Sequence, residues 1–536
     1  MTGGRDSAKQ LTLVACILGS GIALLDGTVV NVALPSIQRA LGGGLAAQQW
    51  IVNGYLLALG SLILIGGSLG DLFGERRVFA VGVCGFGIFS AACAASPSIG
   101  VLVAARALQG VAGALLVPSS LAVIVNTFPQ QERGAAIGTW TAWGAIAGVL
   151  GPLAGGELLA LTSWRAIFLI NVPLAAVCVA LIVSAIPASP PRGDGARRID
   201  VPGALLCALG LGGPVFALIE QPRLGWSSPG VIVPLGVGVA LLCAFVLWES
   251  RTRDPMLTLS LFSRRNFAVG NVETLAVYAG LSVLFFFLIL FLQQIAGYTP
   301  LKSGLATLPV TVVMFFLSRR FGALAGRFGP RLFMGAGPLL AAGGLLFFQG
   351  TGTHVGYLTG VLPPLLLFAL GLSMTVAPLT AAVLAGSEHQ AGIASGVNNA
   401  VARVAGLLGT AAVGAAVAAS FASSIEQRLK GARLGHAAMA AVGAAKRLPL
   451  GRPGTSGLPH DQAVAVRSAA EAASLHAFHL GMGIAATLVA LGGIVGAVGI
   501  SNRPGQEPAE DTQARPLLGS IVPTATAPRS GEAGSR

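Results

Sequence analysis

Asp26, Arg106, Glu273 and Arg403 are charged side chains that lie inside long apolar runs of the chain. An aspartate at the centre of a membrane helix costs about 2.5 kcal/mol or more, so such a residue usually faces an aqueous path or a partner of opposite charge. These four residues are therefore the first candidates for moving an ion or binding a charged molecule within a membrane.

Asp26 and Arg106 are placed at similar depths by the runs that contain them. Asp26 stands eight residues before Leu34, and Arg106 stands seven residues after Ile99. At 1.5 Å of rise per residue, both lie roughly 11 Å below the same membrane surface, so we expect them to meet. A carboxylate beside a cation can release its proton and take it up again, which is what proton exchange requires. A static ion pair holding two helices together is the alternative.

The second half of the chain carries further candidates. Glu273 is a possible second proton-coupling acid or a ligand for a cationic substrate, and a water-facing structural acid near a helix end is the alternative. Asn398 and Arg403 share a later apolar run and are candidates for a substrate cavity. Trp50 and Tyr55 begin the second run, where anchoring at the membrane surface explains an aromatic residue as well as ligand stacking does.

The elements that must hold these residues are membrane helices. Of the 536 residues, 54% are hydrophobic and 10% charged, and the mean hydropathy is +0.79, far above that of a domain whose surface faces water. Apolar runs of about 20 residues, the length that crosses a bilayer, recur along the chain. We count fourteen, arranged as six, two and six, which predicts an all-α polytopic membrane protein.

This pattern divides the chain into four parts. Residues 1–186 form a first six-helix bundle, 187–265 a linker with two additional membrane helices, 266–501 a second six-helix bundle, and 502–536 a tail rich in Pro, Gly, Ser and Thr that we predict to be disordered. The second bundle contains a long loop, 420–478, whose last part is expected to be helical. Two such bundles with a substrate site between them are typical of transporters that work by alternating access.

Lys and Arg in the short connections predict the orientation. They gather in the connections after even-numbered runs, as at Arg76, Arg77 and Arg133, which places those connections and both termini in the cytoplasm. The loop 420–478 is also basic but is expected outside, because long loops escape the charge rule. The pI of about 10.4 therefore reflects membrane orientation rather than nucleic-acid binding, since the basic residues form no single face.

Small residues mark the fifth run. Gly144, Gly148, Gly151 and Gly155 follow one another at steps of four, three and four, so they share a helix face. Small side chains let helix backbones approach closely, and Pro152 permits a kink. The face can seal against the opposite half of the molecule during exchange; ordinary tight packing in a chain with 75 glycines is the alternative.

A tight turn follows the second run. It combines Asp71, Gly74 and Arg76, a pattern that suits a gate or brace between helices, with a solvated turn as the alternative.

Several function classes are disfavoured. The chain has no Gly-x-x-x-x-Gly-Lys-Ser/Thr loop, so an ion gradient is the expected driving force. The six cysteines and six histidines form no zinc-binding spacing, and we expect no metal, no cofactor and no enzyme activity. A membrane sensor that does not transport would be expected to carry a folded signalling domain.

Taken together, these motifs resemble the major facilitator superfamily, and in particular its fourteen-helix drug:proton antiporters. Residues 25–35 (LDGTVVNVALP) resemble the first-helix signature of that branch, and 67–77 resemble the loop motif of the superfamily, with Glu75 where a basic residue is usual. Arg106, Gln109 and Gly110 are similar to the fourth-helix motif. The glycines with Pro152 are similar to the fifth-helix antiporter motif, and 163–173 (SWRAIFLINVP) to the segment that follows it.

The resemblance implies a proton-coupled exporter of amphipathic small molecules, such as drugs or antibiotics, acting as a monomer in the cytoplasmic membrane of a bacterium, among membrane lipids and without nucleic acid. It implies proton coupling at Asp26, Arg106 and Glu273, and gating at Asp71, Gly74, Arg76 and the small-residue face of the fifth run. The substrate-cavity candidates are Asn31, Trp50, Tyr55, Gln109, Asn398 and Arg403. Export of an endogenous metabolite or lipid, uptake, or a sensor role remain the alternatives.

Overall fold

The computed structural model describes residues 2–187, 199–353, 355–385 and 391–502. In these residues, fourteen helices are long and apolar enough to cross a membrane, which confirms the predicted number and the all-α class.

The chain first forms one group of helices: α1 (Thr2–Leu41), α2 (Leu45–Phe73), α3 (Glu75–Ala95), α4 (Ile99–Thr127), α5 (Gln130–Leu161), and α6 (Ala166–Leu169) with α7 (Asn171–Ala185), which together make one span. A hairpin follows, made of α8 (Val201–Leu224) and α9 (Pro229–Arg251). The second group comprises η1 (Leu259–Ser263), α10 (Arg265–Gln294), α11 (Pro300–Phe328), α12 (Pro330–Phe347), η2 (Phe348–Gly350), η3 (Tyr357–Val361), α13 (Leu362–Leu384), α14 (Ala391–Leu429), α15 (His436–Lys446) and α16 (His460–Gly499).

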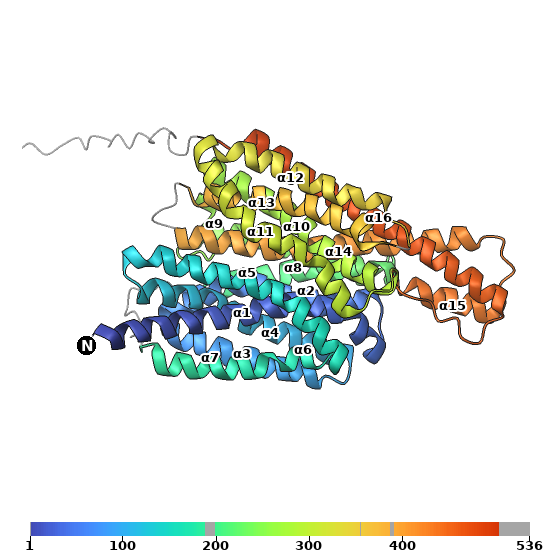
Figure 1. Cartoon of the computed structure of the whole chain (residues 1–536), viewed down its shortest axis with the longest axis horizontal. Helices are drawn as coiled ribbons and strands as arrows, with labels where there is room; N and C mark the ends of the chain where they lie inside the picture. The colour runs from blue at the N-terminus through green and yellow to red at the C-terminus, as the bar shows by residue number, and fades with distance from the viewer. Residues whose placement is uncertain (1, 188–198, 354, 386–390, 503–536) are drawn as a thin grey trace, which may run out of the picture.

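The long helices run roughly side by side along the long axis of the molecule (Figure 1). Helices α1 to α7 make up the lower half of this view and most of α10 to α16 the upper half. The chain starts at one end of the bundle, here called the N-terminal end, and α15 projects from the other, here called the α15 end. The α8–α9 hairpin packs against α2 and α14, where the two halves adjoin.

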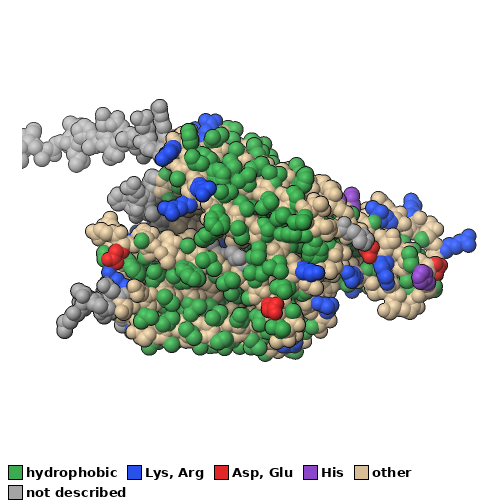
Figure 2. Space-filling view, in the orientation of Figure 1, with side chains coloured by type: hydrophobic (Ala, Val, Ile, Leu, Met, Phe, Trp, Pro, Cys, Tyr) green, Lys and Arg blue, Asp and Glu red, His purple; other side chains and the backbone are tan. Residues whose placement is uncertain are grey.

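Apolar side chains cover the middle of the visible face, and Lys and Arg side chains lie toward its two ends (Figure 2). Many large apolar side chains on the surface of the molecule are more than half exposed, among them Ile88, Val183 and Phe316. An apolar belt of this type suits the hydrocarbon of a bilayer, which solvates such side chains in place of water.

The predicted span 166–186 is broken rather than continuous. Helix α6 ends at Leu169 and α7 begins at Asn171. Pro173 has no N–H to donate to the carbonyl of Leu169, and its ring crowds that carbonyl, which accounts for the break. The break places Asn171 at the first turn of α7, deep in the first half of the molecule.

The loop 420–478 contains more helix than the sequence analysis predicts. Helix α14 continues to Leu429, α15 forms within the segment expected to be irregular, and α16 already begins at His460. Alanine is the strongest helix former, and α15 carries six alanines among its eleven residues. These helices form the projection at the α15 end (Figure 1).

The two halves meet at the α15 end. Gln49 Nε2 of α2 donates to the carbonyl of Thr410 on α14 at 2.6 Å, and Thr410 Oγ1 donates to Asn53 Oδ1 at 2.9 Å. Gln293 Nε2 of α10 donates to the carbonyl of Val32 on α1 at 2.9 Å. These residues lie near the helix ends that adjoin the α15 projection, since the Leu45 N–H donates to the carbonyl of Arg447.

Candidate functional site

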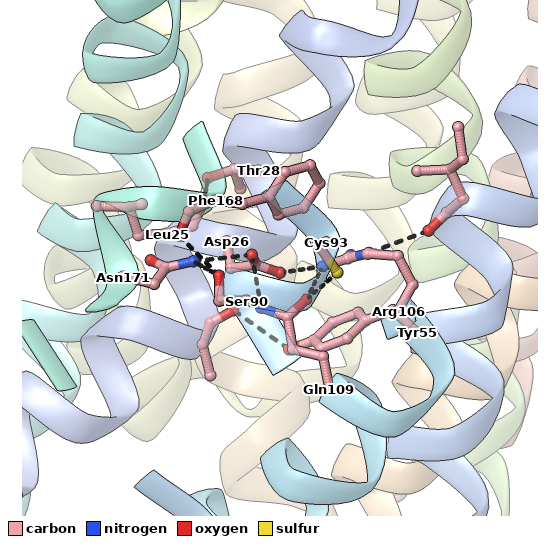
Figure 3. Close-up of polar contacts among 12 residues, drawn as sticks. Leu25, Asp26, Thr28, Tyr55, Ser90, Cys93, Arg106, Gln109, Phe168 and Asn171 are labelled. Carbon is pink, nitrogen blue, oxygen red and sulfur yellow. Dashed lines mark hydrogen bonds and ion pairs between the residues drawn. The ribbon is translucent and has the colours of Figure 1, made fainter. Parts of the chain in front are cut away.

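A buried polar cluster surrounds Asp26 on α1. The Asp26 side chain is 0% exposed and Arg106 of α4 is 1% exposed, and Arg106 Nη1 forms an ion pair with Asp26 Oδ2. Asp26 Oδ1 accepts from Gln109 Nε2 at 3.1 Å and from Asn171 Nδ2 at 3.0 Å (Figure 3). The predicted meeting of Asp26 and Arg106 is confirmed.

Arg106 is held by further contacts. Its Nε donates to the carbonyl of Ile51 at 3.1 Å, and its Nη1 also donates to Gln109 Oε1 at 2.8 Å. The guanidinium lies over the Tyr55 ring, 4.3 Å from the centroid. These contacts come from α2 and α4. The position of the Arg106 guanidinium beside Asp26 therefore depends on both helices.

Asn171 and Ser90 complete the cluster. Asn171 Nδ2 donates to Ser90 Oγ at 3.0 Å, and Ser90 Oγ donates to the carbonyl of Phe168 at 2.8 Å. Neither residue is among the candidates predicted from the sequence. Asn171 belongs to the stretch 163–173 that resembles the family, which is the signal that could have found it. Ser90 carries no such signal.

The arrangement can stabilise a charged carboxylate inside the membrane. Three side chains from α4 and α7 donate to one acid on α1. Hydrogen bonds and a cation favour the charged form of an acid. The same three donors join α1 to α4 and α7 through Asp26.

Tyr55 and Gln109, predicted for the substrate cavity, belong to this cluster. Tyr55 is 2% exposed, and its hydroxyl donates to the carbonyl of Ala23 at 3.4 Å. Arg403 of α14 interacts electrostatically with Tyr55, and its Cβ lies 3.2 Å from where a Cβ on Gly60 of α2 would stand. Arg403 therefore lies on the side of α14 that faces α2.

The other cavity candidates lie in different surroundings. Asn31 on α1 is half-buried, and its Oδ1 has no hydrogen-bond partner. Asn398 Nδ2 of α14 donates to Thr274 Oγ1 at 2.8 Å and to Asn271 Oδ1 at 3.2 Å, both on α10. Asn398 therefore joins two helices of the second half in this structure.

Trp50, a candidate for the substrate cavity or for anchoring, packs against the hydrophobic cluster that Val215 and Ile219 of α8 form with Leu407 and Ala411 of α14. Its Nε1 donates to Glu220 Oε1 at 3.1 Å, and its ring is 5.9 Å from that of Phe216. Both partners belong to α8. The α8–α9 hairpin packs against α2 on the side to which Trp50 points, so the residue anchors that hairpin.

Glu273 is buried rather than water-facing, which corrects one of the alternatives given above. It is 0% exposed, and neither carboxyl oxygen has a hydrogen-bond partner. A Cβ on Gly496 of α16 would stand 2.3 Å from Glu273 Oε2 and 2.7 Å from the carbonyl of Met334 on α12. Glu273 thus faces α12 and α16, whereas Asn271 and Thr274 of the same helix face α14.

The small-residue face of α5 packs mainly within its own half in this structure. Added Cβ atoms would meet Leu24 at Gly144, Thr28 at Gly151 and Val29 at Gly155, all on α1, and nothing within 4 Å at Gly148. The reason is that α1 lies along this face. Contact with the opposite half comes from the next positions, since the Pro152 carbonyl lies 2.4 Å from where a Cβ on Gly304 of α11 would stand, and a Cβ on Gly156 would meet Leu301.

The turn between α2 and α3 is built around Gly74, whose φ of 89° favours glycine. Arg76 Nη2 donates to the carbonyl of Val183 on α7 at 2.8 Å. Asp71 is exposed. Glu75, the position that departs from the superfamily pattern, is buried and accepts from Asn126 Nδ2 of α4 at 2.8 Å. The turn therefore ties α3 to α4 and α7.

Comparisons with known proteins agree with this architecture. The sequence model of the Major Facilitator Superfamily matches residues 16–410. The Multidrug resistance protein Stp of Mycobacterium tuberculosis is 36% identical over 425 residues, which cover 79% of this chain and 78% of that protein. The Puromycin resistance protein pur8 of Streptomyces alboniger is 38% identical over 417 residues, 76% of this chain and 82% of that protein.

Solved structures show the same fold at low sequence identity. A bacterial homologue of the human lysosomal transporter Spinster, inward-facing and unoccupied, aligns with a TM-score of 0.59 at 16% identity, over 92% of this chain and 98% of that one. A D-xylose-proton symporter aligns with a TM-score of 0.59 at 14% identity, over 92% and 98%. The chain belongs to the major facilitator superfamily.

Proposed function

We propose that this protein is a proton-coupled antiporter that exports amphipathic small molecules, such as antibiotics, across the cytoplasmic membrane of a bacterium. The observation that carries the proposal is the fully buried Asp26 on a membrane helix, with donors from α4 and α7. The relatives supply the cargo class, since their names describe resistance to multiple drugs, to puromycin and to methylenomycin A, and export of tetracenomycin C.

In this mechanism Asp26 carries the proton. In the outward-open state the acid takes up a proton as cargo leaves; in the inward-open state it releases that proton to the cytoplasm before new cargo binds. The affinity of the acid for its proton must differ between the two states. A change in the distance from Arg106 or Asn171 to Asp26 supplies that difference.

The orientation follows from the basic connections at the N-terminal end, which favour the cytoplasm. Both termini are then inside, and the α15 projection is outside. The contacts between the halves at the α15 end, such as Gln49 with Thr410, close the outer side. This conformation accordingly corresponds to an inward-facing state.

The remaining site residues take supporting roles in this proposal. Glu273 is a second acid that can hold a proton, at a place facing α12 and α16 rather than the cargo path. The α2–α3 turn with Asp71, Gly74 and Arg76, and the α5 face with Pro152, act in the change of conformation. Asn31 and Arg403 are the candidates for contact with cargo, and the transporter works as a monomer.

Export of a lipid-like molecule is the second candidate. A cavity of about 380 Å³ lies between α2, α8, α9, α10 and α14, and its described lining is almost wholly apolar, with Asn271 as the amide side chain. Such a cavity suits an acyl chain as well as an apolar drug.

Inside-out membrane vesicles test the proposal. Vesicles from cells that express the chain are given an inside-acidic pH gradient and puromycin, tetracenomycin C, methylenomycin A or a fluorescent phospholipid. We expect at least one antibiotic to accumulate, and accumulation to collapse when an uncoupler is added. Accumulation of the phospholipid alone would favour the second candidate. Accumulation that survives the uncoupler would contradict proton coupling.

A further inference from the structure

Two carboxyl groups meet at the base of the α8–α9 hairpin, far along the chain from the Asp26 cluster. Asp200 directly precedes α8, and Glu249 lies in the last turn of α9. Asp200 is 7% exposed and Glu249 is 3% exposed. The proposed transport mechanism uses neither residue.

Each carboxyl group has one oxygen engaged and one oxygen left over. Asp200 Oδ1 accepts from the Gly203 N–H at 2.9 Å and from Trp248 Nε1 at 2.8 Å. Glu249 Oε2 accepts from the Leu257 N–H at 2.9 Å. Asp200 Oδ2 and Glu249 Oε1 are buried and have no hydrogen-bond donor.

The two remaining oxygens point to the same place. A Cβ on Gly203 would stand 2.4 Å from Asp200 Oδ2 and 2.6 Å from Glu249 Oε1, so both oxygens lie against the same face of this glycine. Any larger residue at position 203 would push them away. The absence of a side chain here is what lets the two carboxyl groups approach.

Two ionised carboxylates cannot share such a place without a cation or a proton, because like charges at short range disfavour ionisation of both. A calcium ion requires six to eight oxygen ligands, far more than two remaining carboxylate oxygens supply. A shared proton requires only two oxygens, one as donor and one as acceptor. An O–H donated by one carboxyl to the oxygen of the other satisfies both atoms at once and leaves the pair with a single negative charge.

We propose that Asp200 and Glu249 form a proton-binding site in which one proton is shared between Asp200 Oδ2 and Glu249 Oε1. The thiol of Cys207, which lies one turn after Gly203 on α8, is close enough to Glu249 to interact with it electrostatically. Arg251 and Arg253 follow Glu249 but are exposed. Within the described residues, the donors that face the pair are the backbone N–H groups of Gly203, Met256 and Leu257 and the Trp248 indole.

The site joins three pieces of the chain. Asp200 caps the start of α8, Trp248 and Glu249 belong to the end of α9, and Leu257 lies in the segment that leads to α10. When the proton leaves, two negative charges lie side by side against Gly203. Their repulsion loosens the hairpin from the segment that enters the second half of the molecule.

Infrared difference spectroscopy on the purified full-length protein tests the site. Spectra are recorded while pH is stepped, and the band of protonated carboxyl groups is followed in wild type, Asp200→Asn, Glu249→Gln and the double variant. Asn and Gln keep the size of the acid and donate an N–H to the remaining carboxylate. Glu220→Gln is the matched control, because Glu220 lies on the same hairpin and has Trp50 and Arg223 as partners.

The expected result is a specific pattern of amplitudes. Each single variant loses the same part of the pH-dependent carboxyl band, the double variant loses no more than either single one, and the control loses none of it. Two independent acids would instead give additive losses. A band unchanged in both single variants would overturn the proposal, and so would a band that Ca²⁺ or Na⁺ removes at constant pH, since that marks a cation site.

The fluorescence of Trp248 offers a second readout if one variant fails to fold. Its indole N–H donates to Asp200 Oδ1, so its emission, obtained as wild type minus Trp248→Phe, responds to the charge of the pair. We expect this difference signal to titrate with pH in wild type and in the Glu220→Gln background, and to be flat in Asp200→Asn. A signal that titrates equally in Asp200→Asn would contradict a shared proton.

Discussion

At the scale of residues, the Asp26 cluster places one acid under the control of donors from two other helices. Arg106, Gln109 and Asn171 all donate to its two oxygens. Removing one partner of a buried ion pair costs about 3–5 kcal/mol, because an uncompensated charge remains. Among the three donors, loss of Arg106 should therefore lower the stability of the protein most.

Arg106→Ala should abolish exchange and lower the thermal stability of the purified protein, by about 3–5 kcal/mol if Asp26 stays ionised. Arg106→Lys should retain part of the stability but little transport, since an ammonium cannot reach Asp26, Gln109 and the Ile51 carbonyl in the fixed geometry of a guanidinium. Thermal unfolding and vesicle transport measure the two effects. Arg39→Ala is the control, because Arg39 is exposed and bonds within its own helix. An Arg106→Ala protein as stable as the control would contradict the assigned role of the ion pair.

Part of this cluster could be predicted from the sequence. The depths of Asp26 and Arg106 in their helices predict that they meet, because helix rise converts residue number into position. The contact of Asn171 depends on the break at Pro173, and the burial of Glu273 depends on α12 and α16 packing over it. Trp50 turns toward α8 because of the hairpin. Such contacts follow from packing between distant segments, which local pattern does not encode.

At the scale of elements, α5 shows that a sequence pattern can predict close packing without specifying the helix that approaches. The glycine spacing predicts one small-residue face, and the structure has α1 on that face at Gly144, Gly151 and Gly155. The spacing alone does not say which helix approaches. In helix α15 two local signals disagree. Its alanines favour a helix, whereas the Gly and Pro residues around it favour a loop, and the segment is helical in the structure.

Gly148 and Gly151 separate packing from gating. At Gly148 an added Cβ meets nothing within 4 Å, so Gly148→Leu should fold and insert normally. We expect this variant to lose exchange or to leak protons, because α5 needs its small face when the halves rearrange. Normal coupled transport by Gly148→Leu would mean that position 148 has no gating role.

Gly151→Leu is the comparison variant. Its Cβ would stand 2.0 Å from Thr28 Oγ1 and 3.0 Å from the Leu25 carbonyl, so α1 and α5 must separate. Overpacking of this kind typically costs 1–3 kcal/mol, and we expect a lower unfolding temperature in detergent than for Gly148→Leu. Equal stability of the two variants would argue against the observed α1–α5 contact.

At the scale of the whole molecule, the number of helices could be predicted because hydropathy and bilayer thickness constrain each span separately. The conformation, in which the α15 end is closed, could not be predicted in this way. Which end closes depends on contacts such as Gln49 with Thr410 and Gln293 with the Val32 carbonyl, between residues far apart in sequence. The domain boundaries at 186, 265 and 501 stay predictions, and residues 188–198 and 503–536, on which the linker arginines and the tail fall, lie outside the described part of the chain.

The orientation predicts which ends of the bundle are reachable from outside. Cysteine at Gly454, which is exposed and has open space around its Cβ, should react with a membrane-impermeant maleimide on intact cells. Cysteine at Gly326, which is also exposed and lies near the end of α11, is the matched control and should react only after permeabilisation. The wild-type protein supplies the background of the native cysteines. The reverse pattern would contradict cytoplasmic termini.

The central claim is that Asp26 couples cargo export to the proton gradient. Purified wild-type protein and Asp26→Asn are reconstituted in liposomes with a cargo identified in the vesicle assay, and uphill movement is measured with a pH gradient as the sole driving force. Asparagine keeps the size of aspartate and can still accept a hydrogen bond, so the variant should fold and bind cargo but cannot exchange a proton. We predict that Asp26→Asn shows no uphill transport, while Asp26→Glu retains part of it with a shifted pH profile. If well-folded Asp26→Asn still accumulates cargo uphill, Asp26 is not the coupling acid and Glu273 becomes the next residue to test.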